Sequence, residues 1–203
     1  MLTLQFDQNA LKDKNRFELL ITDENELSGL PESARDAAAM LAKSKDKNGW
    51  LFNLSAPSYI PFMRYSDKRD LREKMYREYM SVGNKGDEFD NKDIIKKIVN
   101  IRLEIAQLMG FKNYAEYALE HTMAKNSANV YKLLNQLLEA YKPIAINEYN
   151  AVEGFALGTE KENITVMPWD WSYYSEKLRD IRFKVNDEMT RPYFCLLYTS
   201  DAA

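Results

Sequence analysis

The chain has 203 residues, of which 45% are hydrophobic and 29% charged, and its 28 basic and 31 acidic side chains give a net charge of −3. This composition is typical of an ordinary globular protein, and the absence of a basic stripe argues against a nucleic-acid partner. No apolar run reaches membrane-spanning length, and the opening residues MLTLQFDQNALK lack the pattern of a signal peptide. We therefore expect no membrane partner and take the cytoplasm as the default compartment, provided that Met1 is the true start.

Two short segments alternate in hydrophobicity as β-strands do. In FELLIT (17–22) the first, third and fifth residues share one apolar face, and WLFNL (50–54) shows the same alternation. Between them, Pro31 opens a helix-like run that reaches Ser44, and a proline in the first helical turn costs no hydrogen bond. The two strands could pair in either direction, because the connection between them includes a helix.

The clearest helix follows the expected N-cap Asp90 and ends at Gly110, a residue suited to the left-handed conformation that stops a helix. Its apolar residues recur every third or fourth position and form one stripe, which consists of Ile94, Ile98, Ile101, Ile105 and Leu108. A shorter helix is predicted over 66–80, with Ser66 as its N-cap. The preceding YIPFMRYS (59–66) is interpreted as a packed, turn-forming entry to that helix.

Two further helices are predicted in the second half of the chain. One starts at Ser127, and Pro143 should kink or break it before it resumes towards Phe155. The other starts at Asp170, with an apolar side formed by Trp171, Tyr174, Leu178 and Ile181. The sequence thus predicts a mainly α fold: a helical scaffold with a small two-stranded β element.

Residue types that usually carry catalysis are scarce. The single histidine, His121, is placed on a helix near Met123, where such a side chain is more often packed or half-exposed than a metal ligand or base. Glu116 and Glu120 lie one turn apart, a spacing that usually marks a solvated face in an acid-rich helical chain. Cys195, the single cysteine, has no histidine partner that its spacing would nominate. From the residues we assign no catalytic, cofactor-binding or metal-binding position to this chain.

The most unusual local pattern is the aromatic cluster MPWDWSYY (167–174). These rings could form a groove wall or a stacking platform for a ligand. The favoured interpretation is a helix start whose rings pack into the core while Asp170 accepts hydrogen bonds from the free amides.

Residue order adds a resemblance. The segments WLFNLSAPSYIPFM from 50, RDLREKMY from 69, DNKDIIKKIVNIRLEIAQLMGFKNYA from 90, MAKNSANVY from 123 and PWDWSYYSEKLR from 168 occur in this order. Together they resemble the thimet oligopeptidase family of zinc peptidases, from about Leu2 to Phe194. The variants look closest to the bacterial dipeptidyl carboxypeptidase branch, which removes dipeptides from peptide C-termini.

The resemblance implies a larger α-helical zinc metallopeptidase that acts on short peptides and is monomeric when complete. In that family the zinc ligands and the general base lie on an H-E-x-x-H helix and a later helix, both downstream of the P-W-D segment. Two imidazoles and a carboxylate hold the metal, which activates a water for attack on the peptide carbonyl. This chain has no counterpart to those positions, so we carry none over and expect zinc in the complete parent and none bound by this chain.

We therefore expect 1–194 to be an internal portion of the peptidase. CLLYTSDAA (195–203) resembles one reading frame of a transposase adapter used in sequencing libraries, so we expect a non-native tail there. A portion of a larger enzyme should expose apolar faces that its missing helices would cover, especially along 127–157 and at the aromatics of 169–174. A free-standing helical interaction domain without catalysis is the alternative, and it should not expose such faces.

Overall fold

The computed structural model describes residues 1–160, 164–184 and 189. Over these residues the fold is mainly α with one small two-stranded β element, as predicted. The two strands run antiparallel, a direction that the sequence leaves open. The elements in chain order are α1 (Leu2–Arg16), β1 (Leu19–Ile21), the 3-10 helix η1 (Glu24–Leu27), α2 (Glu32–Ser44), β2 (Trp50–Phe52), α3 (Ala56–Tyr65), α4 (Arg69–Met80), α5 (Lys92–Leu108), α6 (Tyr114–Leu119), α7 (Ser127–Thr159) and α8 (Pro168–Phe183). None of the described helices is both long and apolar enough to span a bilayer.

The two strands pair in the register Leu19–Phe52, Leu20–Leu51 and Ile21–Trp50. On β1 the predicted alternation is confirmed, because Leu19 and Ile21 are buried and Leu20 between them is exposed. On β2 the prediction of one apolar face is incomplete, since Leu51 is buried as well as Phe52. The cause is α2, which packs against β2 and covers the second face of the ribbon.

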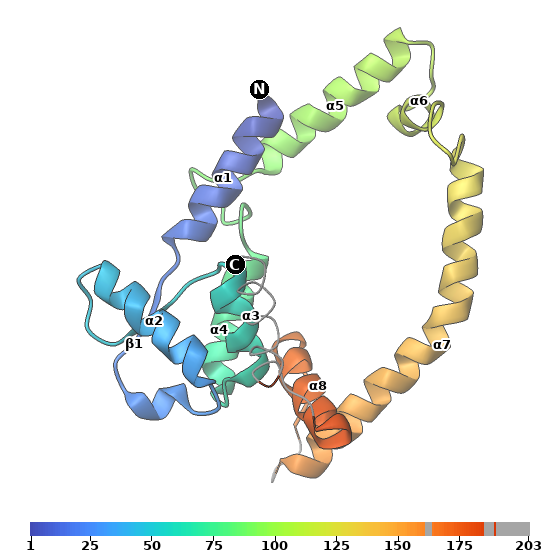
Figure 1. Ribbon diagram of the computed structural model, residues 1–203. Helices are drawn as coiled ribbons and strands as arrows, with labels where there is room; N and C mark the ends of the chain where they lie inside the picture. Colours follow the sequence, from blue (N-terminus) through green and yellow to red (C-terminus); the bar gives the residue numbers. More distant parts are fainter. Residues whose placement is uncertain (161–163, 185–188, 190–203) are drawn as a thin grey trace, which may run out of the picture.

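The main core lies where β2, α3, α4 and α8 meet (Figure 1). Its fully enclosed side chains include Phe52 and Phe62, whose rings meet edge to face at 4.8 Å, and Met75 from α4. Trp169 from α8 closes this core from the far end of the sequence. The C-terminal part of the described chain therefore completes a core that the first 80 residues begin.

The segment 59–66 is a helix and not the turn-forming entry that the sequence suggests. It belongs to α3, which begins after the N-cap Ser55 and contains Pro61 in its interior. The helix nevertheless ends where the prediction starts the next one. Ser66 is the C-cap of α3, so α4 begins three residues later, with Lys68 at the N-cap position.

Helix α5 ends as predicted, with Gly110 at φ 83° and the amide of Phe111 donating to the carbonyl of Ala106 at 2.8 Å. At its start the N-cap position belongs to Asn91, and the Asp90 carboxylate accepts from the amide of Lys92 at 2.9 Å, so it still satisfies a first-turn donor. Of the predicted stripe, only its first isoleucine is buried, while Ile101, Ile105 and Leu108 are exposed.

Helix α1 is an element that the sequence analysis does not predict. Its inner face is half polar, because Asp13 is completely buried and Asn9 donates to the side chain of Asn91 at 3.1 Å. The Asp13 carboxylate accepts from the amide of Gly83 at 2.7 Å and from the side chain of Arg16 at 2.7 Å. The contacts of Asp13 with Gly83 and of Asn9 with Asn91 attach α1 to the segment between α4 and α5.

Helix α7 runs unbroken through Pro143 and bends near its middle (Figure 1), so the predicted kink is present and the predicted break is not. It begins at the N-cap Asn126, whose side chain accepts from the amide of Asn129 at 2.9 Å. Every residue from 131 to 150 is exposed, and among the described elements the main contacts of α7 are with α6 and α8. The expected exposure along 127–157 is thereby confirmed except around Val152 and Ala156, which are buried.

Candidate functional site: the polar junction of α4 and α8

The junction of α4 and α8 is organised around the fully buried carboxylate of Asp170. Arg72, which is also fully buried, donates to Asp170 at 2.8 Å, and Arg69 donates to it at 2.7 Å. Asp170 also accepts from the amide of Met167 at 3.1 Å, so it caps the start of α8 as predicted, from the third helical position. One carboxylate thus closes the helix end and fixes α8 to α4.

The guanidinium of Arg72 also contacts the backbone. Arg72 donates to the carbonyls of Ser66 at 2.7 Å and Trp169 at 3.3 Å. Its guanidinium also lies over the ring of Tyr173, with its central carbon 3.9 Å from the ring centroid. These contacts compensate the burial of the charge, because each polar atom taken from water is given a partner.

Burial alone would raise the pKa of Asp170, but hydrogen bonds from Arg69, the Met167 amide and Arg72 outweigh it and hold that pKa below its ordinary value of 3.8. The carboxylate therefore stays ionised at neutral pH and fully engaged with its donors. Because the buried carboxylate is engaged by Arg69, Arg72 and the Met167 amide, the junction positions α8 against α4.

The aromatic cluster 167–174 divides between core and surface. Trp169, Tyr173 and Tyr174 are buried, which agrees with the core interpretation and contradicts the expectation that these rings are exposed. Trp171 is 38% exposed and stacks on Tyr149 of α7 with 7° between the ring planes. The predicted apolar side of α8 is confirmed for Tyr174, which is buried, and for Leu178, which packs against the same cluster. It is wrong for Ile181, which lies in solvent, and it misses Trp169 and Tyr173, which face inward.

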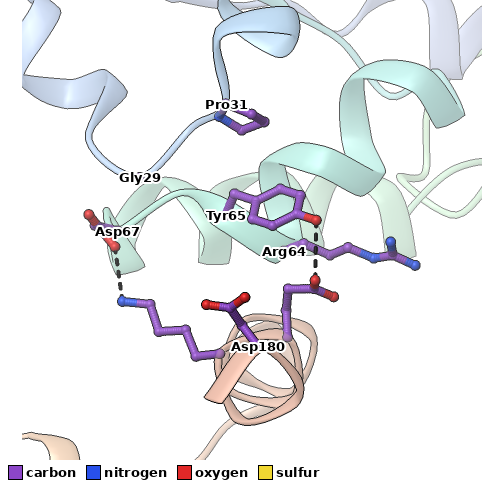
Figure 2. A pocket seen from close by; sticks show the side chains of 8 residues that line it. Gly29, Pro31, Arg64, Tyr65, Asp67 and Asp180 are labelled. Atoms are coloured by element: carbon purple, nitrogen blue, oxygen red, sulfur yellow. Dashed lines mark hydrogen bonds and ion pairs between the residues drawn. The ribbon is translucent and has the colours of Figure 1, made fainter. Parts of the chain in front are cut away.

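Next to the junction lies a pocket of about 430 Å³ between the loop before α2, the end of α3 and one side of α8 (Figure 2). It is lined by Gly29, Pro31, Arg64, Tyr65, Asp67, Glu176, Lys177 and Asp180. The loop can lie this close only with a glycine at position 29, where φ is 84° and an added Cβ would lie 2.1 Å from the carbonyl oxygen of Tyr65. No pattern in the sequence predicts this pocket.

The acidic groups of the pocket are held by neighbouring donors. Asp67 accepts from Ser28 at 2.7 Å, from the phenol of Tyr173 at 2.7 Å and from Lys177 at 3.3 Å. The buried Glu176 accepts from the phenol of Tyr65 at 3.2 Å (Figure 2). Burial would raise the pKa of Asp67, and the three donors lower it overall, whereas burial and the bond to Asp67 raise the pKa of Tyr173.

Both groups therefore keep their ordinary protonation states near neutral pH, the carboxylate ionised and the phenol protonated. The labelled Asp180 carboxylate lies opposite Tyr65 across the pocket in Figure 2. This arrangement can hold a polar or cationic group, but it presents no poised base, acid or nucleophile. The pocket is suited to recognition or packing.

The described residues that the sequence suggests as catalytic or metal-binding candidates do not form a common site. His121 lies in the turn after α6 and not on a helix, with its side chain 90% exposed and Glu120 3.6 Å away. Glu116 belongs to the N-terminal turn of α6, where its amide donates to Asn113 at 2.9 Å and its carboxylate accepts from Asn113 at 3.1 Å. That reciprocal pair is a helix cap. Cys195 lies outside the described residues.

No group of three His, Cys, Asp or Glu side chains in the described part of the chain is placed to hold a metal ion. Among the described residues, no side chain is therefore assigned to the zinc site that the family resemblance implies. No reaction step through a metal follows from this chain's own side chains.

A sequence model of Peptidase family M3 matches residues 62–199. The chain belongs to peptidase family M3. Oligopeptidase A of Haemophilus influenzae is 41% identical over 95% of this chain and 29% of its own length. Oligopeptidase A of Salmonella typhimurium is 39% identical over 94% of this chain and 28% of its own length.

Dipeptidyl carboxypeptidase of Escherichia coli is also similar, with 28% identity over 95% of this chain and 28% of its own length. The predicted peptidase family is confirmed, and both kinds of relative that the resemblance suggested are found. Identity is higher with the oligopeptidases A than with this dipeptidyl carboxypeptidase, so these values do not favour the dipeptidyl carboxypeptidase branch. The chain spans less than a third of the length of each of these relatives.

The sequence patterns do not identify the two arginines of α4, which hold α8, or the acidic residues of the pocket. Arg69 and Arg72 lie three residues apart and so share one helix face, a spacing that is visible in the sequence. Their partner Asp170 lies about a hundred residues further along the chain, and a single sequence gives no sign of that pairing.

Proposed function

We propose that this M3-family chain is part of a zinc metallopeptidase that hydrolyses short peptides, and that it supplies helical scaffold and part of the substrate cleft wall. The observation that carries the proposal is the 41% identity to an oligopeptidase A across 95% of this chain. Similarity spread over nearly the whole chain favours a shared architecture over the chance recurrence of one motif.

We further propose that the chain is inactive by itself. A catalytic zinc site needs three protein ligands, commonly from histidine and acidic side chains, plus an open position for water. The chain contains one histidine, and the residue is exposed in a turn. When bound in the complete enzyme, the metal would supply the activated water and polarise the peptide carbonyl.

Two substrate preferences are open within this proposal. The higher identity to proteins named oligopeptidase A favours cleavage within oligopeptides. Release of C-terminal dipeptides, which the sequence resemblance suggests, is the second candidate, because a dipeptidyl carboxypeptidase is also among the relatives. A monomeric enzyme in the cytoplasm, with peptides as its only partners, remains the predicted setting.

The free-standing interaction domain is less well supported. Such a domain should cover its large apolar side chains, whereas α5 and α7 leave theirs in solvent. Exposure of this kind is expected for a portion of a larger helical enzyme, and it agrees with the family membership.

The test is a peptidase assay of two proteins, this chain and a chimera in which residues 1–194 replace the matching segment of the Haemophilus oligopeptidase A. We expect chelator-sensitive cleavage by the chimera and none by the chain. Product analysis by mass spectrometry then separates internal cleavage from stepwise loss of C-terminal dipeptides. Chelator-sensitive cleavage by the chain alone would contradict its inactivity, and a folded chimera that is inert with added zinc would contradict the peptidase role.

A further inference from the structure

Helix α7 carries a broad apolar face that nothing in the described chain covers. We define the α7 apolar face as Tyr131, Leu134, Leu137, Leu138, Tyr141 and Ile144, each of which is at least 43% exposed. At about 100° of rotation per residue, these six positions fall within an arc of about 140°. Lys132, Gln136 and Glu139 lie outside that arc, on the opposite side of the helix. The helix is therefore amphipathic, with its apolar side in solvent.

The face continues into a hollow at the junction of α7 and α8. Ala145 and Tyr149 extend the same side of α7 by about one further turn. They line a depression of about 600 Å³ together with Val166, Met167, Pro168 and Trp171. The stacked rings of Tyr149 and Trp171 form its aromatic part. The face and the hollow make one continuous apolar strip about 27 Å long, at 1.5 Å per residue from Tyr131 to Tyr149.

A strip of this length and width has the shape of a helix-binding groove. An amphipathic helix of about five turns can lie along it, with apolar anchors at i, i+3 or i+4, and i+7. The size of the hollow suits one large anchor side chain at the end of that helix. Solvent exposure of so many large apolar side chains is otherwise unfavourable, and in soluble proteins such patches mark sites of association.

The relatives indicate where the occupant comes from. This chain matches only 29% of the Haemophilus oligopeptidase A and 28% of the Salmonella protein. More than two thirds of those polypeptides therefore lie outside the match. We propose that the α7 apolar face and its hollow seat an amphipathic helix from that remaining part of the peptidase polypeptide. This inference rests on the proposed function and deepens it, because it names which surface joins this portion to the rest of the enzyme.

The test compares the isolated chain with the chimera. Leu134→Gln with Leu138→Gln removes apolar surface from the face while keeping good helix formers, and Lys132→Gln with Glu139→Gln makes matched changes on the polar side. In the isolated chain both double variants should melt within about 2 °C of the unsubstituted chain, because both pairs of side chains are exposed. In the chimera the leucine pair should lower the melting temperature, and the polar pair should not.

A labelling experiment keeps the inference testable if a variant fails to fold. Leu138→Cys is placed in a Cys195→Ser background, and maleimide modification at position 138 is followed by mass spectrometry. We expect modification at least ten times slower in the chimera than in the isolated chain. If the chimera does not fold, the same cysteine is introduced at the aligned position of the Haemophilus oligopeptidase A, where it should be equally protected.

Equal labelling rates in the isolated chain and the complete enzyme would overturn the proposal. It would also be overturned if the isolated chain formed a dimer that the leucine pair dissociated, because a second copy would then occupy the face. Failure of the proposed function is a separate result. A folded chimera without peptidase activity contradicts the function, while protection of position 138 still decides what covers α7.

Discussion

The packed part of the molecule, formed by β1, β2, α2, α3, α4 and α8, and the arm formed by α5, α6 and α7 both carry large apolar side chains at regular spacing. The packed part buries them: Leu54 and Phe62 are fully enclosed. The arm leaves most of them in solvent, and Leu138, of the same chemistry as Leu54, is 58% exposed. The difference shows that hydrophobic periodicity identifies a face that needs a partner, whereas only the three-dimensional structure shows whether the partner is present.

The two regions also differ in how polar groups are used. In the packed part the ion pair of Arg72 and Asp170 is buried and tied to backbone carbonyls and an amide. In the arm, the polar contacts are local and include the helix caps made by Asn113 and Asn126 and the surface pair of Lys96 and Asp93. Caps stabilise each helix separately, whereas the buried pair joins segments that are far apart in sequence.

The largest expected effect follows from breaking the buried pair. Asp170→Asn leaves the buried Arg72 without its counter-charge, so the free energy of unfolding should fall by about 3–5 kcal/mol in urea titrations. The matched control is Glu73→Gln, which removes a surface ion pair with Arg77 and should cost no more than about 1 kcal/mol. Equal losses in the two variants would show that the junction does not hold the packed part together.

The contribution of Asp170 to the free energy of unfolding should also depend on pH. The pKa of Asp170 is lowered in the folded state, so its contribution is fully present above the ordinary value of 3.8 and is lost as the pH falls below it towards the folded pKa. Chemical denaturation at several pH values should therefore show the gap between the unsubstituted chain and Asp170→Asn narrowing below about pH 4. A gap that stays constant down to pH 2 would contradict the assigned ionisation.

A leucine-to-alanine pair compares the two regions with identical chemistry. Leu54→Ala should destabilise the isolated chain by about 2–5 kcal/mol, because it opens a cavity in the core. Leu138→Ala should change the free energy of unfolding by no more than about 0.5 kcal/mol, because its side chain lies in solvent. Thermal or urea unfolding checks both values. A large loss in Leu138→Ala would mean that the arm has a partner within the isolated chain.

The sequence predicts the fold where buried residues are apolar. The two strands and the stop of α5 at Gly110 follow from pattern and turn chemistry alone, whereas the exposed stretch of α7 follows from the family resemblance. Sequence patterns fail to predict the fold where the buried face of a helix contains charged or polar residues. Helix α1 is missed because Asp13 lies on its inner face, and the inner face of α8 is misassigned because Glu176 lies on it.

The candidate site is less predictable than the fold, for a related reason. The capping role of Asp170 is local and can be predicted, because it depends on residues within one turn. Its pairing with Arg69 and Arg72 depends on the packing of α8 against α4, which no local pattern encodes. The pocket beside it requires Gly29 and Asp67 to meet α8, and that meeting is likewise a product of the tertiary fold.

The smallest expected effect concerns the C-terminal residues 195–203, which lie outside the described part of the chain and remain predicted to be a non-native tail. Deleting them should change the free energy of unfolding by no more than about 0.5 kcal/mol, since a foreign sequence has no matching surface in the fold. Urea titration of the shortened chain is the measurement. A loss of several kcal/mol would show that the tail belongs to the fold.

Hydrogen exchange followed by mass spectrometry tests most directly the contrast between a self-sufficient packed part and an arm that needs the rest of the enzyme. In the isolated chain, amides of β2, α3, α4 and the start of α8 should exchange slowly, while those of 131–150 should exchange much faster. In the chimera with the Haemophilus oligopeptidase A, 131–150 should become as protected as α4. Protection of 131–150 that is already equal to that of α4 in the isolated chain would contradict the account.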